Sequence, residues 1–203
     1  MGELRTFVNE EAAASEVGNP DRHGAARPSG VTSRLIRSSD AEPLAALLTA
    51  NREFLRPWTP VREPAFFTAD GQRGLVEGAL DAHRDGTGFP CVITDRHDRL
   101  IGQITLTDIH RGPVQSGSVG YWVSEELNGR GIARDALATI VREAFGPLSL
   151  HRLTAATLLA NHASQRVLES AGFTRIGVAQ SAYRIDGRWQ DHVLYQLVRP
   201  ERR

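Results

Sequence analysis

Lysine is missing from this sequence of 203 residues, because all 24 basic residues are arginine. The absence excludes Schiff-base chemistry on the chain's own side chains, a catalytic lysine and the phosphate-binding loop that ends in lysine. A GC-rich coding bias is enough to explain why arginine replaces lysine. The 24 arginines are balanced by 24 Asp and Glu, and the formal net charge is zero. A protein that binds nucleic acid through a general basic field is therefore not expected.

Cysteine occurs only once, as Cys91, which excludes an internal disulfide and a zinc site built from several thiolates. Because Cys91 lies in the apolar run Pro90–Thr94, we interpret it as a small buried residue rather than as a nucleophile. No two histidines have the spacing of metal ligands, so no metal is predicted. A run of about 18 apolar residues and a secretory signal are also missing. Together these absences predict a cytoplasmic protein in a reducing compartment, with no membrane partner.

The composition that is present is that of a folded globular protein, with 40% hydrophobic and 24% charged residues. A chain of this length buries about 70% of its extended surface on folding, which is enough for one substantial core. Residues 1–30 are rich in Ala, Glu, Gly, Asn and Pro and have no sustained periodicity, so we expect a mobile extension there. Residues 31–203 are expected to form a single domain.

Hydrophobic periodicity predicts a mixed α/β fold. Ser39-Asp40-Ala41-Glu42 has the pattern of a capping box at the start of the first helix, and Asp186-Gly187 has the pattern of a two-residue hairpin turn. We expect strands near 33–37, 91–94, 100–107, 118–123, 151–158, 173–185 and 189–198, and helices from 39 onward and near 70–84, 129–145 and 161–172. The alternation of strand and helix over 118–172 predicts a ligand at the carboxyl ends of these strands.

The segment Glu126–Arg134 joins a predicted strand to the longest predicted helix. Its two glycines, Gly129 and Gly131, let the backbone turn sharply and approach a ligand closely. The helix behind them presents unpaired amides and the positive end of its dipole, and Arg130 and Arg134 add charged donors. Physically this is a cradle for phosphate, although it matches neither the dinucleotide-binding nor the mononucleotide-binding glycine pattern. Taken by itself, an ordinary loop before a helix is the alternative.

Four segments carry a family resemblance: Asn51–Trp58; Gly120–Val123 with Asn128–Ala133; Asn161–Ser164 with Ala171–Phe173; and Asp186–His192. With them the sequence resembles the GCN5-related N-acetyltransferases (GNAT), and within that superfamily the RimJ/RimL type, which acetylates the N-termini of ribosomal proteins. The resemblance covers about residues 32–198, and the second and third segments are specific to the superfamily. It implies a GNAT acyltransferase fold, with a mixed, largely antiparallel sheet flanked by helices, and acetyl-CoA as the acetyl donor.

The resemblance also implies where acetyl-CoA binds. Its pyrophosphate is expected on the backbone amides of the cradle, with Arg134 alongside. Asn128 stands where the family usually has Gln or Arg, so the contribution of a longer side chain is missing there. The pantetheine is expected along Tyr121–Val123, at a strand edge opened by divergence from the strand 151–158. The residues implied in binding are Tyr121, Trp122, Val123, Asn128, Gly129, Arg130, Gly131, Ile132, Ala133, Arg134, Asn161 and Ser164.

The chemistry that the resemblance implies is the attack of a neutral amine on the thioester carbonyl, in which an oxyanion and then a thiolate develop. The amide of Val123 is the expected oxyanion donor. Many family members protonate the thiolate with a Tyr where this sequence has Leu168, whereas the ribosomal-protein branch uses a Ser at the place of Ser164. We therefore assign Ser164 to this step, and Asn161 to CoA binding and the helix start. A plain helix cap for Asn161 and an ordinary first-turn serine for Ser164 are the alternatives.

The general base is not assigned. Asp108, His110 and Tyr121 are candidates, and each has a surface or packing role as its alternative. A chain of water molecules to solvent could serve instead, because an α-amine with a pKa near 8 is partly neutral at about pH 7.

Candidates for the acceptor site are Phe54, Leu55, Trp58, Tyr121, Trp189 and Asp191. The first three either form the wall of a groove for a peptide N-terminus or belong to the core. Asp191, beside the last turn, either attracts an ammonium group or makes a structural hydrogen bond. The expected acceptor is the N-terminal amine of a ribosomal protein, and a small-molecule amine or an acyl-CoA-binding module without turnover are the alternatives. Both a monomer and a homodimer are compatible with the sequence.

Overall fold

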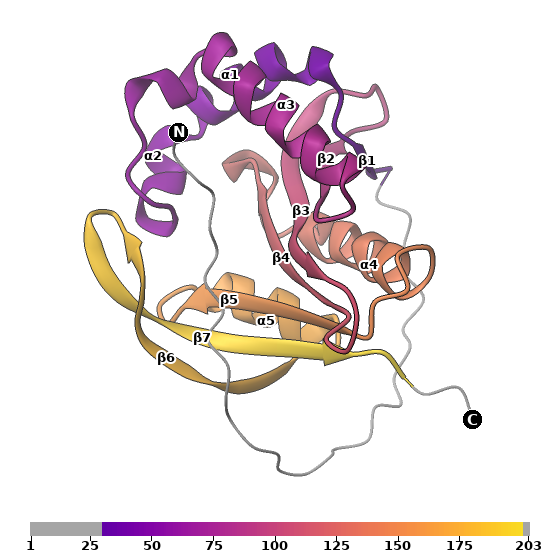
Figure 1. Cartoon of the computed structure of the whole chain (residues 1–203). Coiled ribbons are helices and arrows are strands. Elements are labelled where there is room, and N and C mark those ends of the chain that lie inside the picture. Colours follow the sequence, from indigo (N-terminus) through magenta and orange to yellow (C-terminus); the bar gives the residue numbers. More distant parts are fainter. Residues whose placement is uncertain (1–29, 201–203) are drawn as a thin grey trace.

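A computed structural model describes residues 30–200, so the extension expected at 1–30 lies, apart from Gly30, outside the described residues. The strands are β1 (Thr32–Leu35), β2 (Phe89–Thr94), β3 (Leu100–His110), β4 (Ser116–Val123), β5 (Arg152–Leu158), β6 (Thr174–Ile185) and β7 (Arg188–Val198). The helices are α1 (Ala41–Ala50), α2 (Arg52–Leu55), α3 (Ala69–Arg84), α4 (Ile132–Phe145) and α5 (His162–Ser170). Short 3₁₀ turns lie at Ser38–Asp40, Arg56–Trp58, Pro64–Phe67 and Glu125–Leu127. The strands and helices expected from the sequence occur in the expected order, and the short helix α2 lies between the first two of these helices (Figure 1).

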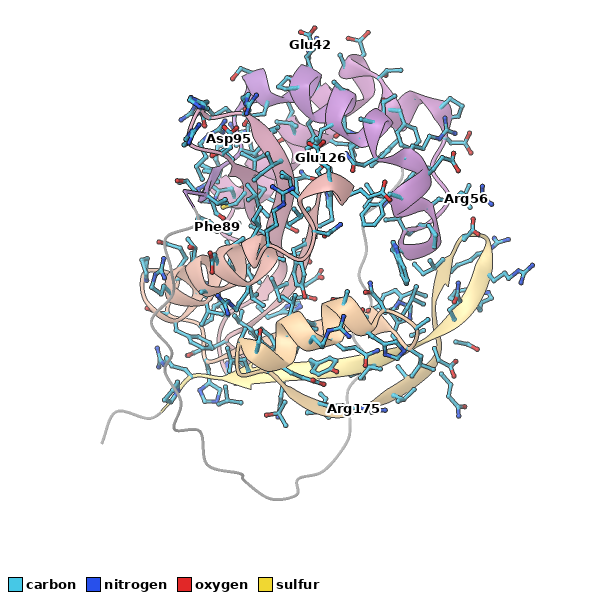
Figure 2. All side chains as sticks on the ribbon, turned by 180° about the vertical axis from the view of Figure 1, so that it is seen from behind. Glu42, Arg56, Phe89, Asp95, Glu126 and Arg175 are labelled. Atoms are coloured by element: carbon cyan, nitrogen blue, oxygen red, sulfur yellow. The ribbon has the colours of Figure 1, made fainter. Side chains whose placement is uncertain are left out.

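The strands form one seven-stranded sheet in the order β1-β2-β3-β4-β5-β7-β6. Neighbouring strands are antiparallel except for β4 and β5, which are parallel. A parallel pair needs a crossover connection, and α4 supplies it. The predicted mixed, largely antiparallel sheet is therefore confirmed. Figure 1 shows α4 and α5 behind this sheet, and the reversed view in Figure 2 shows them in front of it.

The two parallel strands separate soon after they begin to pair. Residues Ser116–Ser118 of β4 lie opposite Arg152–Thr154 of β5, whereas both strands continue, to Val123 and Leu158. Within residues 30–200, the edge of β4 that faces away from β3 has no strand beside it after Ser118. Figure 1 shows β4 and β5 diverging. The divergence that the family resemblance implies is therefore present.

Alternate residues of the strands contribute to two separate cores, because successive side chains of a strand point to opposite faces of the sheet. The core under α4 and α5 includes Ile104, Val119, Leu137, Ile140 and Leu168. The core under α1 and α3 includes Leu44, Leu48, Val76 and Val92. On β4, Tyr121 packs against the first core and its neighbour Trp122 against the second. The two aromatic residues therefore serve opposite faces of the sheet.

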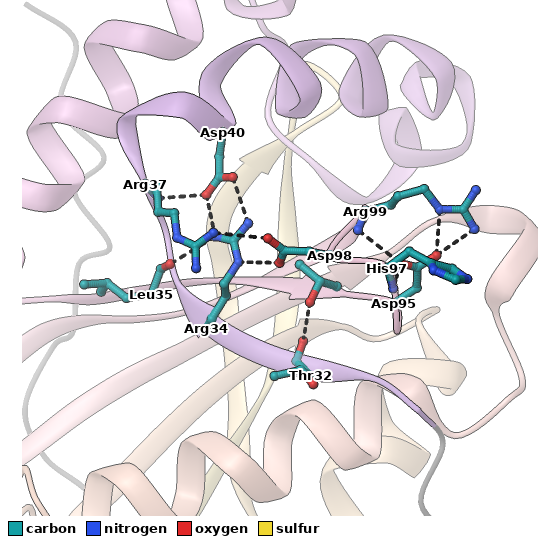
Figure 3. A network of polar contacts seen from close by, with 10 residues as sticks. Thr32, Arg34, Leu35, Arg37, Asp40, Asp95, His97, Asp98 and Arg99 are labelled. Atoms are coloured by element: carbon teal, nitrogen blue, oxygen red, sulfur yellow. Dashed lines mark hydrogen bonds and ion pairs between the residues drawn. The ribbon is translucent and has the colours of Figure 1, made fainter.

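The start of α1 differs from the expected capping box. The chain makes a 3₁₀ turn over Ser38–Asp40 before α1 begins, and the carboxylate of Asp40 accepts a hydrogen bond from the amide of Arg37 at 2.7 Å. The same carboxylate binds the guanidinium of Arg34 through two hydrogen bonds of 2.7 and 2.9 Å. Arg34 also donates to Asp98 in the turn between β2 and β3, at 2.7 Å (Figure 3). Asp40 thus joins β1 to the start of α1, and Arg34 links both to this turn. The position of Asp40 in a capping-box pattern did not predict this role.

Replacing Asp40 with asparagine should lower the free energy of unfolding by about 2 kcal/mol at neutral pH, because the partly buried Arg34 loses one of its two charged partners and keeps only the exposed Asp98. Burial by itself would raise the pKa of Asp40, but the hydrogen bonds from Arg34 and Arg37 outweigh it and hold the pKa below its usual value. The carboxylate therefore stabilises the wild type above about pH 4, and this contribution is lost as the pH falls further. Urea unfolding across pH 3–7 measures the difference between wild type and Asp40→Asn, which should shrink at the acid end.

The control for this prediction is Asp81→Asn, which removes an exposed carboxylate that pairs with Arg84 one turn later in α3. Exposed pairs of this kind contribute less than about 0.5 kcal/mol. An equal loss of stability in both variants would contradict the role given to Asp40.

Candidate functional site

The phosphate cradle predicted from the sequence lies between the end of β4 and the start of α4, next to Glu126 (Figure 2). Gly129 and Gly131 have φ angles of +75° and +81°, a left-handed conformation that residues other than glycine adopt at a cost. Gly131 is the N-cap of α4. The two glycines therefore turn the chain so that the amides at the start of α4 face outward.

The amides of the cradle are free to bind a ligand. The first amide of α4 with a partner is that of Asp135, which donates to the carbonyl of Gly131 at 3.0 Å. Among the described residues, no hydrogen bond is made by the amides from Gly129 to Arg134. Arg130 donates to the carbonyl of Glu126 at 3.1 Å, and the half-exposed side chain of Arg134 lies 3.7 Å from Asp135. Unpaired amides, the helix dipole and two arginines make a binding site for an anion physically favourable.

Asn51 is a residue of this site that sequence reasoning left without a role. Its side chain is buried, and its Oδ1 accepts hydrogen bonds from the amide of Glu125 at 2.8 Å and the hydroxyl of Ser124 at 3.2 Å. Its Nδ2 donates to the carbonyl of Leu47 at 2.9 Å. Asn51 therefore fastens the end of α1 to the turn that leads from β4 into the cradle. Its two partners in that turn lie more than 70 residues away in the chain, so no local pattern could have found them.

Ser164 and Tyr121 meet at the gap between β4 and β5. The hydroxyl of Ser164 lies 3.1 Å from the Oη of Tyr121, which also donates to the carbonyl of Ser164 at 3.2 Å. Asn161 caps α5 by accepting a hydrogen bond from the amide of Ser164 at 3.0 Å. The capping role of Asn161 is thus present, and it places Ser164 in the first turn of α5.

Tyr121 is unsuitable as the general base. Burial raises its pKa to about 12, although the hydrogen bond with Ser164 lowers it in part. A phenol with such a pKa keeps its proton at neutral pH and is therefore not available to take a proton from an amine. Its side chain lies on the α5 face of the sheet, away from Trp122, so it is also not part of the acceptor wall expected around Leu55.

A cavity of about 540 Å³ lies on the opposite face, between the helices α1 to α3 and the strands β3 and β4. Most of its wall is apolar and includes Leu48, Leu55, Phe66, Val76, Leu106 and Trp122, and its polar groups include Arg52, Arg62, Gln103 and Thr105. The guanidinium groups of Arg52 and Arg62 lie over the rings of Phe67 and Phe66, at 4.5 and 4.9 Å. An apolar cavity with a few polar groups is the usual form of a small-molecule or side-chain binding site.

The acceptor candidates of the Asn51–Trp58 segment separate in the structure. Leu55 lines the cavity, and Phe54 packs against the core under α1 and α3. Trp58 is 36% exposed and is not part of the cavity wall. Trp122, expected with the cofactor, turns its side chain into the cavity and donates to Gln103 at 3.3 Å.

The tip of the β6–β7 hairpin reaches the same cavity. Arg56 donates to the carboxylate of Asp186 at 3.3 Å, and the amide of Asp186 donates to the carbonyl of Thr59 at 3.2 Å. Figure 2 shows Arg56 facing this hairpin tip. The contact joins the segments Asn51–Trp58 and Asp186–His192, which both carried the family resemblance and lie about 130 residues apart.

Asp191 makes the structural hydrogen bond that was one of its two alternatives. Its Oδ1 accepts from the amide of Ser181 at 2.8 Å, where β6 leaves regular register between Ala179 and Tyr183 and Ser181 has a φ of +47°. The carboxylate thus holds an irregular stretch of β6. Trp189 is 66% exposed near the hairpin tip.

His192 is a second residue of this region without a role in the sequence analysis. It is buried on β7, opposite Leu158 of β5 and Ala179 of β6. Its ring packs edge-on against Tyr183, with 4.5 Å between the ring centroids. Its Nδ1 lies 3.1 Å from the carbonyl of Gln190, and burial lowers its pKa.

Three further expectations from the sequence concern a nucleophilic cysteine, a metal site and a membrane-spanning segment. Cys91 is buried, as expected, and burial raises the pKa of its thiol to about 12, so it is not a nucleophile. Within residues 30–200, no three His, Cys, Asp or Glu side chains gather in a way that could hold a metal ion. In the same part of the chain, no helix combines the length and apolar character that crossing a membrane requires.

Comparison with known proteins identifies the family. The family model described as acetyltransferase (GNAT) domain matches residues 31–174. Two bacterial relatives are "Probable N-acetyltransferase YjcK" of Bacillus subtilis (strain 168), 34% identical over 83% of this chain and 93% of that protein, and ribosomal protein uS5-alanine N-acetyltransferase of Escherichia coli (strain K12), 30% identical over 83% and 87%.

Two solved structures share the fold. Ribosomal-protein-S5-alanine acetyltransferase from Vibrio fischeri superposes with a TM-score of 0.81 and 34% identity, covering 84% of this chain and 93% of that chain. Mycobacterium smegmatis RimJ in complex with CoA-disulfide superposes with a TM-score of 0.79 and 29% identity, covering 83% and 81%. The open strand pair, the cradle and these matches together establish that the chain belongs to the GNAT acetyltransferase family and is an N-acetyltransferase related to those that modify ribosomal proteins.

Proposed function

We propose that this protein moves an acetyl group from acetyl-CoA to the N-terminal α-amine of a protein, with a ribosomal protein as the first candidate. The observation that carries the proposal is the gap between β4 and β5, which has the cradle and Ser164 on one face and the apolar cavity on the other. Donor and acceptor could therefore meet at the gap from opposite sides of the sheet. The related RimJ structure contains CoA-disulfide, and two relatives are named as S5-alanine acetyltransferases, which supports this choice of donor and acceptor.

The backbone of β4 fits the pantetheine arm of such a donor. The amide of Ser124 donates to Ile101 of β3 at 2.8 Å. Because backbone amides alternate in direction along a strand, the amides of Tyr121 and Val123 point away from β3, toward the open edge. Amides at this edge can pair with the amide groups of pantetheine, and in the proposed reaction the amide of Val123 stabilises the developing oxyanion.

The proposed reaction is a direct transfer in a ternary complex. The amine nitrogen attacks the thioester carbonyl, and the bond from carbon to sulfur breaks. The CoA thiolate accepts a proton from Ser164, whose hydroxyl takes up a proton from solvent in the same step. The phenol of Tyr121, which stays protonated, supports the Ser164 hydroxyl at 3.1 Å. No covalent intermediate on the enzyme is needed, which agrees with a chain whose cysteine is buried and which has no lysine.

Release of free thiol from acetyl-CoA tests the proposed function directly. The acceptors are short peptides that start with Ala, Ser or Met, together with a set of small amines. Turnover with one class of peptide supports the proposal and ranks its specificity. Turnover with small amines alone would mean that the acceptor is a small molecule and not a protein. Tight CoA binding without turnover on any acceptor would favour a binding module.

A further inference from the structure

His192 stands out as a titratable group that the reaction described so far does not use. It is the only histidine of residues 30–200 whose side chain is buried. We propose that the Nε2 of His192 accepts the proton that the attacking amine loses as its nitrogen bonds to the acetyl carbon. This inference rests on the proposed acetyl transfer and supplies the general base that the sequence left unassigned.

The position of His192 on the sheet supports this role. Ser118 of β4 lies opposite Thr107 of β3, which lines the cavity, and opposite Thr154 of β5. Every second residue of a strand has its side chain on the same face of the sheet. Trp122 therefore lies on the same face as Ser118, and Leu158 lies on the same face as Thr154. His192 pairs with Leu158 in β7. It is therefore on the cavity face of the sheet, at the end of β5 where the gap from β4 is open.

The other residues of β7 confirm this choice of face. Val193, the next residue, pairs with Thr157 and packs in the core under α4 and α5. Because neighbouring side chains of a strand alternate, His192 points away from that core. The arrangement puts the proton donor Ser164 and the proposed proton acceptor His192 on opposite faces of the sheet, so each could serve a different proton transfer.

The contacts of the imidazole leave Nε2 as its acceptor atom. The Nδ1 lies 3.1 Å from the carbonyl oxygen of Gln190, which can only accept a hydrogen bond, so Nδ1 carries the proton and Nε2 the lone pair. The edge-on packing with Tyr183 holds the ring in place. Among the described residues, the one buried side-chain nitrogen or oxygen without a partner is the Ser33 hydroxyl. Within residues 30–200, Nε2 likewise makes no hydrogen bond, and because it is not such a buried atom it keeps contact with solvent.

The charged groups around His192 suit a base that works at neutral pH. Burial lowers the pKa of His192, against weaker opposite effects of the Gln190 carbonyl and of Asp191, so the ring is neutral in the resting protein. On β6, burial and the charge of Asp108 on β3 raise the pKa of Tyr183, which therefore stays neutral. When Nε2 takes the proton, Asp191 stabilises the imidazolium, which then passes its proton to solvent. The amine ends as an acetamide and CoA as a free thiol, so atoms and charge balance.

The variants His192→Gln and His192→Ala test the proposal in the full-length protein, with the acceptor that the wild type turns over best. We expect kcat/KM to fall about a hundredfold in both, the usual contribution of a general base, while the affinity for CoA stays unchanged. Wild-type kcat/KM should fall at acid pH as His192 is protonated, at a pH below the ordinary histidine pKa of about 6.5 because burial lowers its pKa. This fall comes in addition to the one caused by protonation of the amine near pH 8. The fall in kcat/KM that protonation of His192 causes, the acid limb of the pH profile, should be missing in both variants.

Added imidazole provides a readout that a structural role would not change. It should restore part of the activity of His192→Ala, whose missing ring leaves room for it, and it should not change His151→Gln, which alters an exposed histidine before β5. Activity of His192→Gln within threefold of wild type would overturn the proposal. A large loss with the acid limb retained and no rescue by imidazole would also overturn it, and would leave His192 as a packing residue.

The proposed function is tested separately by the wild type. If the wild type acetylates an acceptor and both variants do so equally well, the inference about His192 fails and the proposed function stands. If the wild type acetylates none of the acceptors, the proposed function fails and the role of His192 fails with it.

Discussion

Replacing Ser164 with alanine should lower kcat by about a hundredfold, the usual contribution of a positioned proton donor. The reason is that the CoA thiolate leaves without a nearby hydroxyl to protonate it. The affinity for CoA should change little, because Ser164 is proposed to act late in the reaction and the cradle is built from other residues. Steady-state kinetics with the best peptide acceptor, together with calorimetric titration of CoA, separates the two quantities.

Two further variants define the role of Ser164 more closely. Ser170→Ala removes an exposed serine at the other end of α5, whose hydroxyl donates to the carbonyl of Val167, and should leave kcat unchanged. Tyr121→Phe removes the phenol 3.1 Å from the Ser164 hydroxyl and should give a smaller loss than Ser164→Ala if Ser164 is the direct donor. A collapse of CoA affinity in Ser164→Ala with kcat preserved at saturation would instead make Ser164 a binding residue.

Replacing Gly131 with valine should weaken CoA binding by about a hundredfold. The φ of +81° at Gly131 is costly for any residue with a Cβ, so the backbone of the cradle should shift and its amides should no longer converge on a phosphate. The loss of two charge-assisted hydrogen bonds, at about 1.5 kcal/mol each, corresponds to a factor of this size. Calorimetric titration with CoA measures it, and dephospho-CoA, which keeps the pyrophosphate, should show the same loss.

The matched control is Gly112→Val in the turn between β3 and β4. Gly112 has a φ of +65° and, like Gly131, has room around it for a Cβ. Gly112→Val should therefore lower stability by a similar amount without changing the affinity for CoA. Unchanged affinity in Gly131→Val would refute the phosphate-binding role of the cradle, whereas weaker binding in both variants would indicate a general loss of stability.

The features that the sequence determined by itself are those that depend on neighbouring residues. The order of strands and helices, the turn at Asp186-Gly187 and the cap of Asn161 on the amide of Ser164 follow from periodicity and from contacts within a few residues. The two glycines of the cradle belong to the same class, because a left-handed turn before a helix is a local demand on the backbone. For these features the chain needs no distant partner, and the sequence pattern predicts them.

Only the tertiary structure decided which distant residues meet. Asn51 binds Ser124 across 73 residues, Arg56 binds Asp186 across 130, and Ser181 binds Asp191 where β6 leaves its register.

The assignment of residues to faces is also a tertiary result. Tyr121 and Trp122 are neighbours in the sequence, yet the two cores place one beside Ser164 and the other in the cavity. His192 acquires a possible role only because β7 lies beside the end of β5, where β4 and β5 have separated. The physical reason is that the burial of a residue, and the neighbours on its face of the sheet, depend on packing between elements far apart in the chain. A local pattern of residue types does not determine that packing.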